Sequence, residues 1–349
     1  MREDFLSICY RSSRFIITKI FYFFQALFIR PKDLESAVVV GDAFLSTISI
    51  IGRPFFNFKI PPRNDIEVFG LGFPSPLVAA SFKSETEILK IWLEMGLGGA
   101  IFKTIMKDER SGSKRPRLQD ASLNGKKGLL NSMGLPGKGL ESFASEITDI
   151  SLWNFGRPLG VSIGGDSIFE YIESVNRIER SLKNKTIPYF YELNVSCPNT
   201  KNGQTIGDDP LELEKLLNEL RFNMQKPISV KVSPDLSNEI LMLIGEICSD
   251  VNQVFINAGN TQYKKTIDVG VELQYFTKEG GGFSGPALIN RTLEMVKLFS
   301  EFDLPIMATG GISNIAHVEA AKENGACLFG MATALVLDPY CVPKINKRL

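Results

Sequence analysis

Histidine is nearly absent from this chain, because His317 is the only one among 349 residues. Catalytic triads and many protein zinc sites use histidine, so a single copy argues against both. His317 stands in a stretch of small and apolar residues that is typical of a helix. We therefore interpret it as a helix residue without a chemical role.

Cysteine is scarce as well, and neither sign of charge is in excess. The five cysteines are odd in number and include no Cys-x-x-Cys pair, which argues against a disulfide framework, a zinc site and an iron–sulfur site. Lys plus Arg and Asp plus Glu both number 39, so the net charge does not favour nucleic acid as a partner. We expect no bound metal and a reducing, cytosolic setting for the main body.

The first 30 residues lack the long uncharged run of a transmembrane helix. The apolar stretch over 15–29 has about 15 residues, against roughly 20 for a span, and it contains Lys19 and Gln25. No small-residue cleavage site follows, so a removed signal peptide is not expected. The basic and aromatic residues predict a helix in peripheral contact with the cytoplasmic side of a membrane. The alternatives are a helix docked on the rest of a soluble cytoplasmic chain or on a partner subunit.

A second helix is expected over 36–52, between Pro31 and Gly52. The two helices predict a small helical extension over residues 1–60, ahead of a catalytic domain over 61–349. Residues 66–73 then favour a short hairpin before the first long apolar run.

Eight short apolar runs alternate with helical patterns in the rest of the chain. The runs begin at residues 77, 99, 159, 189, 228, 253, 304 and 326. This pattern, over about 280 residues, predicts an α/β fold of the (β/α)8 TIM-barrel type. Two connections, 104–158 and 258–303, are long and are expected to cover or build a substrate site.

Polar residues stand where several predicted strands end, namely Lys103, Asn194, Lys231 and Asn257. In such barrels the chemistry lies at the C-terminal ends of the strands. A lysine directed into the barrel mouth loses hydration and requires an anion or a carbonyl group. The sequence therefore predicts an active site at this end.

Glycine-rich turns follow the last two predicted strands, at 310–313 and 330–333. Backbone amides at these positions of a barrel commonly bind phosphate. The glycines of 280–285 are expected to form a flexible loop that a ligand can approach closely. Neither a Gly-x-Gly-x-x-Gly fingerprint nor a Walker A loop is present, so the phosphate is expected to belong to a small cofactor.

Cys197 follows the fourth predicted strand, between Asn194 and Asn199. A thiol can act as a general base, because its pKa can be brought near 7. Asparagine side chains offer both donors and acceptors to an amide-rich ring. A capped turn with a buried thiol is the alternative from this segment alone.

The segment Asn194-Val195-Ser196-Cys197-Pro198-Asn199 resembles the signature of dihydroorotate dehydrogenases. Supporting similarities run from about Gly72 to the C-terminus. They comprise a substrate-loop region at 114–118 and 131–136, a flavin-lysine segment at 230–236, and FMN-phosphate segments at 282–285 and 309–312.

The resemblance implies FMN over the barrel mouth, with Cys197 taking the C5 proton of dihydroorotate while a hydride passes from C6 to flavin N5. Lys103 is implied as the lysine of the catalytic site, with Lys83 as a second candidate. The implied cofactor positions are Ala80, Ser81, Lys103, Thr104, Ser162, Asn194, Lys231, Asn257, Ser284, Gly285, Gly310, Gly311, Ala332 and Thr333. The implied substrate positions are Asn131, Met133, Gly134, Leu135, Asn194, Asn199 and Asn257.

The implied class within the family is mixed. A cysteine base is typical of the soluble class, which commonly uses fumarate, whereas a helical N-terminal extension is typical of the membrane-associated class that uses quinone. We weigh the extension more for the acceptor, and so expect quinone-dependent oxidation of dihydroorotate in pyrimidine biosynthesis, with peripheral membrane contact through residues 1–30 and possible oligomerisation.

Ala258 departs from the family, which usually has Ser or Thr after the asparagine. This motivates alternative activities: an FMN barrel oxidoreductase acting on another dihydropyrimidine or using fumarate, or a flavin-free phosphate-binding lyase or isomerase. A non-catalytic membrane-docked scaffold is a further alternative, against which the intact Cys197, Lys103 and Lys231 argue.

Overall fold

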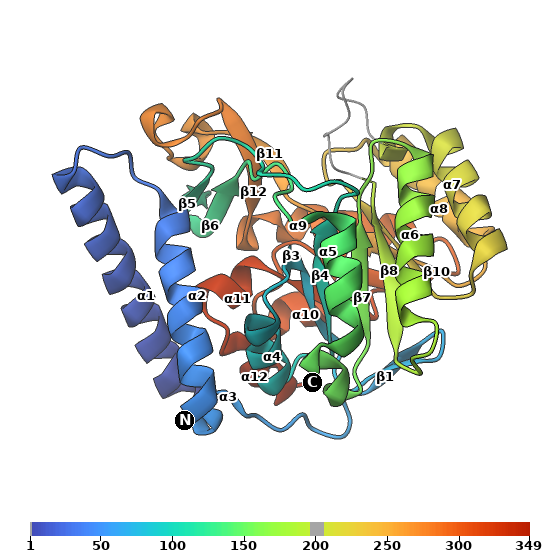
Figure 1. The fold of residues 1–349 in the computed structure, drawn as a ribbon, viewed down its shortest axis with the longest axis horizontal. Helices are drawn as coiled ribbons and strands as arrows, with labels where there is room; N and C mark the ends of the chain where they lie inside the picture. Colours follow the sequence, from blue (N-terminus) through green and yellow to red (C-terminus); the bar gives the residue numbers. More distant parts are fainter. Residues whose placement is uncertain (1, 196–205) are drawn as a thin grey trace.

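The structure, a computed structural model, describes residues 2–195 and 206–349 (Figure 1). Eight parallel strands close into a barrel, and each strand pairs with its neighbours in chain order. This confirms the predicted α/β barrel. The barrel strands are β3 (Leu77–Lys83), β4 (Gly99–Ile105), β7 (Leu159–Ile163), β8 (Tyr189–Asn194), β9 (Ile228–Val232), β10 (Val254–Ala258), β13 (Ile306–Thr309) and β14 (Leu328–Met331).

The outer layer consists of amphipathic helices that bury one face against the strands. In α7, for example, Leu213, Leu216, Leu217 and Leu220 are buried, and Asp209 caps the first turn by accepting from the backbone N–H of Leu211. The helices of this layer and of the C-terminus are α4 (Thr86–Glu94), α5 (Gly139–Glu146), α6 (Ile168–Leu182), α7 (Pro210–Asn223), α8 (Asn238–Ser249), α9 (Ile289–Phe299), α10 (Ile315–Glu323), α11 (Thr333–Leu337) and α12 (Cys341–Asn346).

The barrel interior is filled by side chains from alternate positions of each strand. Near the N-terminal ends of the strands these residues are apolar, and the hairpin of β1 (Ile66–Val68) and β2 (Leu71–Phe73) packs against them. The apolar interior residues are Val78, Ile101, Phe190, Phe255, Met307 and Leu328. Because strand side chains alternate with a period of two, the next inward residue of each strand lies one layer closer to the mouth.

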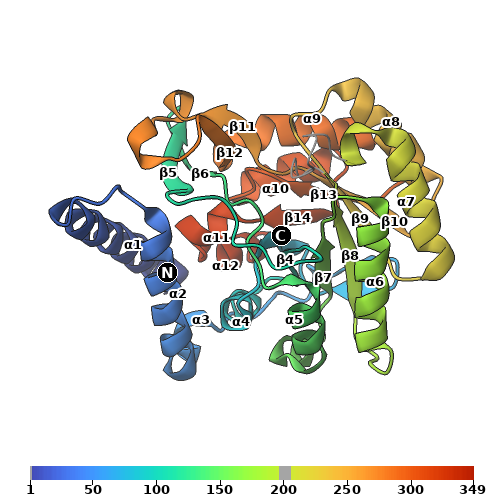
Figure 2. The same cartoon turned by 45° about the horizontal axis from the view of Figure 1, so that its top comes forward.

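A four-stranded antiparallel sheet lies over the mouth, on the side of the N-terminal helices (Figure 2). Its strands come from the two long connections. They are β5 (Leu118–Leu123), β6 (Lys126–Asn131), β11 (Gln262–Lys265) and β12 (Gly280–Ser284), in the order β11-β12-β6-β5.

The glycines of β12 were expected to form a flexible loop, and this expectation is wrong. Residues 280–284 pair with β11 and with β6 as a strand. A Cβ atom on Gly281 would lie 2.4 Å from the carbonyl oxygen of Asn131, and one on Gly282 would lie 2.1 Å from Oγ1 of Thr261. Glycine is therefore required at these positions because neighbouring segments of the same chain approach closely.

Two long helices precede the barrel and form a hairpin beside it (Figure 1). They are α1 (Arg2–Leu27) and α2 (Leu34–Ile51), followed by the short α3 (Arg53–Phe56). One face of α1 contacts the C-terminal region: Ser7 donates to Asp338 at 2.6 Å, and Glu3 pairs with Lys347 at 2.6 Å. The helix is thus docked on its own barrel, and the first helix begins well before the predicted apolar stretch.

The opposite face of α1 is exposed and strongly apolar. Within the part of the chain that the structure describes, no helix has the length and hydropathy needed to cross a membrane. The exposed apolar residues of α1 are Phe5, Ile8, Phe15, Ile16, Ile20, Phe23, Phe24 and Leu27.

Candidate active site

A cavity of about 1270 Å³ lies at the C-terminal ends of the barrel strands. Its walls are the strand ends, the four-stranded sheet and one side of α2. The volume exceeds the range of roughly 300–1,000 Å³ that is usual for one small-molecule site. The cavity therefore has room for a cofactor together with a small substrate.

The floor of the cavity contains a buried polar network built on Glu192. This residue is two positions beyond Phe190 on β8, so it enters the layer above the apolar filling. Its Oε1 accepts from Ser81 at 2.6 Å, and its Oε2 accepts from Asn257 at 2.7 Å. Lys231 donates to the hydroxyl of Ser81 at 2.8 Å. The carboxylate is fully buried, and each of its oxygens has a hydrogen-bond donor.

A second group of hydrogen bonds fixes the end of β8 against β4 and β7. The side-chain amide of Asn194 donates to Thr104 Oγ1 at 2.9 Å, and this hydroxyl lies 3.0 Å from that of Ser162. The backbone carbonyl of Asn194 accepts from the Tyr171 hydroxyl at 3.0 Å. All four residues are buried, so the orientation of Asn194 toward the cavity is determined by its neighbours.

Lys103 brings a cation to the cavity wall from the interior face of β4. Burial lowers the pKa of Lys103, and the charges of Arg117 and Lys83 lower it further, while Glu85 and Glu35 act in the opposite direction. The net effect is a lowered pKa, so the protein supplies less negative charge here than the ammonium group needs. An anionic ligand would make up that difference.

Lys83 lies on the same wall but is already paired. Its ammonium group contacts Asp42 of α2 closely and lies 3.8 Å from Glu85. Burial raises the pKa of Asp42, and the charge of Lys83 acts against this rise. Of the two lysines considered for the site, Lys103 is therefore the one placed to receive a ligand charge.

Glycine turns with left-handed backbone form the end of the cavity near β13 and β14. Gly285, Gly310 and Gly311 have φ values of 142°, 125° and 84°. A Cβ atom on Gly311 would lie 2.7 Å from the backbone nitrogen of Ile289. These positions accept only glycine without strain, and they leave the backbone bare on the cavity side.

Thr333 and His317 make further polar contacts at this end. The hydroxyl of Thr333 donates to that of Ser284 at 2.7 Å. His317 Nδ1 donates to the carbonyl oxygen of Gly311 at 2.9 Å, and burial lowers the pKa of this histidine. The single histidine thus stabilises the glycine turn through its backbone carbonyl.

The end of β6 and the segment that follows it form the roof of the cavity. The side-chain amide of Asn131 donates to the carbonyl of Gly282 at 3.1 Å. Gly134 and Leu135 both have positive φ values, 69° and 50°. A Cβ atom on Gly134 would lie 2.7 Å from Oγ of Ser113, so this turn is packed tightly against the preceding loop.

Most of the predicted site residues border this one cavity. Ser162 and Asn257 do not reach its wall: they lie beneath it and hold Thr104 and Glu192. Cys197 and Asn199 lie outside the described residues. The predicted positions that line the cavity are Ala80, Ser81, Lys103, Thr104, Asn131, Met133, Gly134, Leu135, Asn194, Lys231, Ser284, Gly285, Gly310, Gly311, Ala332 and Thr333.

Several cavity residues were not anticipated from the sequence. Asn260 and Thr261 line the wall beyond Asn257, and Glu35 and Asp42 line it from α2. The amide and hydroxyl of residues 260 and 261 could have been noticed, because they follow a predicted strand end. The acidic residues of α2 gave no such signal, because only the folded chain brings this helix to the mouth.

These features define an α/β-barrel protein with a large site at the C-terminal ends of its strands. The family model for dihydroorotate dehydrogenase matches residues 64–349. The chain therefore belongs to the dihydroorotate dehydrogenase family.

Curated relatives agree with this assignment, and a solved structure has a similar fold. The catalytic subunit of dihydroorotate dehydrogenase B (NAD(+)) from Pyrococcus furiosus is 30% identical over 281 residues, covering 79% of this chain and 89% of that protein. A putative dihydroorotate dehydrogenase A (fumarate) from Aquifex aeolicus is 29% identical over 286 residues, covering 80% and 90%. A crystal structure of DHODH from Eimeria tenella in complex with ferulenol matches with a TM-score of 0.72 at 19% identity, covering 88% and 89%.

Proposed function

We propose that this protein oxidises dihydroorotate to orotate with FMN as its cofactor, and that a quinone takes up the electrons. The observation that carries the proposal is the joint placement of Lys103, Lys231 and the glycine turns around one cavity in a chain of this family. An anion such as the carboxylate of dihydroorotate would compensate the desolvated charge of Lys103.

The residues present fit FMN. Gly285, Gly310 and Gly311 line the cavity with backbone atoms alone, and such turns suit a phosphate. The Lys231 ammonium group, held over the floor by Ser81, would face the flavin ring system. When bound, FMN supplies the hydride-accepting chemistry of the oxidation.

The protein's own groups would bind and orient the substrate and move its proton. Asn131 and Asn194 present amide groups that are fixed by neighbouring hydrogen bonds, as recognition of an amide-rich ring requires. Cys197, three residues beyond Asn194, remains the predicted base for the C5 proton. Enclosure by the roof would limit water at the reacting atoms.

The quinone part of the proposal is supported by the position of α2. Leu34, Val38 and Val39 line the cavity together with Leu118 and Leu129. This apolar flank suits a lipophilic acceptor, and the exposed apolar face of α1 suits peripheral contact with the membrane that would supply it.

Two other acceptors compete with quinone. The names of the similar proteins specify NAD(+) and fumarate as acceptors. Among the described residues, no three His, Cys, Asp or Glu side chains are grouped so that they could hold a metal ion.

One stopped-flow experiment tests the whole proposal. Purified protein is mixed with dihydroorotate or dihydrouracil while flavin absorbance is followed, and the reduced protein is then mixed with a short-chain quinone, fumarate or NAD(+). We expect bleaching by dihydroorotate alone and fast reoxidation by quinone alone. Absence of flavin, or bleaching by dihydrouracil instead, would refute the substrate assignment, and reoxidation by fumarate or NAD(+) instead would refute the acceptor assignment.

A further inference from the structure

Glu35 lies in the first turn of α2, outside the residues that match the family model, yet it reaches a loop of the active site. Its carboxylate binds the guanidinium of Arg117 with both oxygens: Nε donates to Oε2 at 3.0 Å and Nη2 donates to Oε1 at 2.9 Å. The two side chains are 16% and 9% exposed. This is a largely buried, two-point contact, which is the geometry that favours arginine over lysine.

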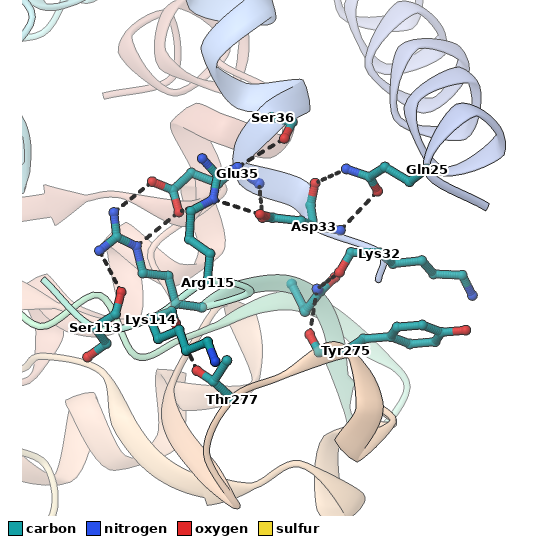
Figure 3. A network of polar contacts seen from close by, with 12 residues as sticks. Gln25, Lys32, Asp33, Glu35, Ser36, Ser113, Lys114, Arg115, Tyr275 and Thr277 are labelled. Atoms are coloured by element: carbon teal, nitrogen blue, oxygen red, sulfur yellow. Dashed lines mark hydrogen bonds and ion pairs between the residues drawn. The ribbon is translucent and has the colours of Figure 1, made fainter. Parts of the chain in front are cut away.

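The third nitrogen of the same guanidinium holds the loop that precedes β5. Nη1 of Arg117 donates to the carbonyl oxygen of Ser111 at 2.7 Å and to that of Ser113 at 2.9 Å. Figure 3 shows Glu35 and Ser113 in one polar network between α2 and the barrel loops. One arginine therefore joins α2 to the loop around residues 111–113.

The network continues from this loop into the roof of the cavity. The backbone N–H of Ser113 donates to the carbonyl of Met133 at 2.9 Å, and that of Ser132 donates to the carbonyl of Arg117 at 2.9 Å. Gly112 is packed between these groups, since a Cβ atom there would lie 2.3 Å from the Met133 oxygen and 2.5 Å from Nη1 of Arg117. A displacement of Arg117 would thus be passed to the segment that carries Asn131 and Met133.

Glu35 supplies the carboxylate that binds Arg117. Burial alone would raise the pKa of Glu35, but the hydrogen bonds and charge of Arg117, with the charges of Arg115 and Lys103, lower it. The carboxylate is therefore ionised at neutral pH. Without it, a mostly buried guanidinium would lose its counter-charge and would be drawn toward water.

We propose that Glu35 is a positioning residue for substrate binding, which acts through Arg117 on the loop 111–113 and on the roof segment 131–135. The inference rests on the proposed function only in taking that roof as part of the dihydroorotate site. It gives α2 a part in binding the substrate, beyond any part in receiving electrons.

Hydrogen–deuterium exchange tests the structural step without any substrate. Glu35→Gln is compared with Asp120→Asn, which removes the pairing of β5 with Arg14 of α1 but touches neither the loop nor the cavity. We expect amides of 108–116 and 131–136 to exchange about tenfold faster in Glu35→Gln, in line with the loss of one charged hydrogen bond. Exchange in Asp120→Asn should equal that of the wild type in these peptides. Wild-type exchange in Glu35→Gln would overturn the proposal.

Orotate titration and steady-state kinetics test the functional step. In Glu35→Gln we expect orotate affinity to fall and KM for dihydroorotate to rise about tenfold, with kcat changed less than about threefold. Glu35→Asp, which keeps the charge, should recover part of the affinity. A fall in kcat at unchanged KM and unchanged orotate affinity would overturn the role.

Two controls keep the outcomes separable. If Glu35→Gln does not fold, Arg117→Lys replaces it, because a lysine keeps the charge beside Glu35 but cannot bind the carboxylate and both carbonyls together. Unaltered exchange in Arg117→Lys would also count against the proposal. If the wild type neither binds orotate nor is reduced by dihydroorotate, the proposed function fails, while the exchange experiment still decides whether Glu35 controls the loop.

Discussion

The ammonium group of Lys231 and the carboxylate of Glu192 lie 3.8 Å apart, and the hydroxyl of Ser81 binds both. Lys231 is 6% exposed and Glu192 is fully buried. Two opposite charges thus occupy the barrel interior, directly above the apolar filling. Their desolvation is offset only while each has its partner, so neither can be removed alone without a cost.

Neutralising Glu192 should therefore destabilise the protein. We expect Glu192→Gln to lower the free energy of unfolding by about 3–5 kcal/mol, because Lys231 would remain buried without a counter-charge. Glu212→Gln is the matched control. It removes an exposed pair with Lys215, and exposed pairs contribute about 1 kcal/mol or less. Urea unfolding measures both, and equal effects of the two substitutions would contradict the assigned role.

The buried polar network in the floor of the cavity shows which parts of the site could be predicted from the sequence. The eight barrel strands and the lysines and asparagines at their ends were predicted, because alternating apolar runs and helices carry a strong periodic signal. Glu192 was passed over, although it stands within the apolar run of β8 and two residues before Asn194. Residues two apart on a strand point to the same side, so a charged residue two positions before Asn194 indicated a second side chain directed into the barrel.

Contacts between distant segments could not be predicted in the same way. The sheet over the mouth joins residues near 130 to residues near 282, and its strands are rich in glycine and lysine, which have low strand propensity. The register between β6 and β12 is therefore fixed by pairing in the folded chain. The same holds for Glu35, whose partner Arg117 is 82 residues away.

The close pairing of β12 with β6 predicts that Gly281 cannot be replaced. A methyl group there would press against the backbone of Asn131, so Gly281→Ala should cost about 1–3 kcal/mol of stability. The same change should weaken orotate binding, since Asn131 would move with its strand. Gly72→Ala in β2 provides the comparison, because open space surrounds that position. Thermal unfolding and orotate titration follow the two variants, and a tolerated Gly281→Ala would mean that β12 can shift without effect.

The lowered pKa of Lys103 predicts an alkaline limit to substrate binding. Burial is the main cause of the shift, so the free enzyme loses this charge at a lower pH than an ordinary lysine with a pKa of 10.5. KM for dihydroorotate should therefore rise with pH from below 10.5. Lys103→Arg should move that rise to higher pH, and Lys103→Met should give a high KM at every pH. A wild-type KM that is flat up to the pH of unfolding would exclude Lys103 as the anion-binding cation.

Replacing the predicted base should change the pH dependence of flavin reduction. Cys197→Ala is expected to bind FMN but to be reduced by dihydroorotate at least about 100-fold more slowly, which is the lower range for loss of a general base. Cys197→Ser should retain some activity, with its rise shifted to higher pH, because a hydroxyl is a poorer base at neutral pH. Cys341→Ser serves as a control away from the cavity lining. Stopped-flow traces across pH report the result, and wild-type rates in Cys197→Ala would exclude the residue as base.

The exposed apolar face of α1 predicts binding to lipid surfaces. Phe23, Phe24 and Phe28 are 65%, 50% and 69% exposed at the end of the hairpin remote from the N-terminus. Changing all three to serine should weaken partitioning onto phosphatidylcholine–phosphatidylglycerol vesicles by about 100-fold or more, since burying each phenylalanine contributes about 1.5–3 kcal/mol. Phe222→Ser, at a 90% exposed position in the last turn of α7, should leave partitioning unchanged. Vesicle sedimentation measures the effect, and flavin reduction by dihydroorotate in solution should be the same in all variants. If the triple variant sediments with vesicles as the wild type does, α1 is not the membrane-binding element, and its apolar face must serve another contact.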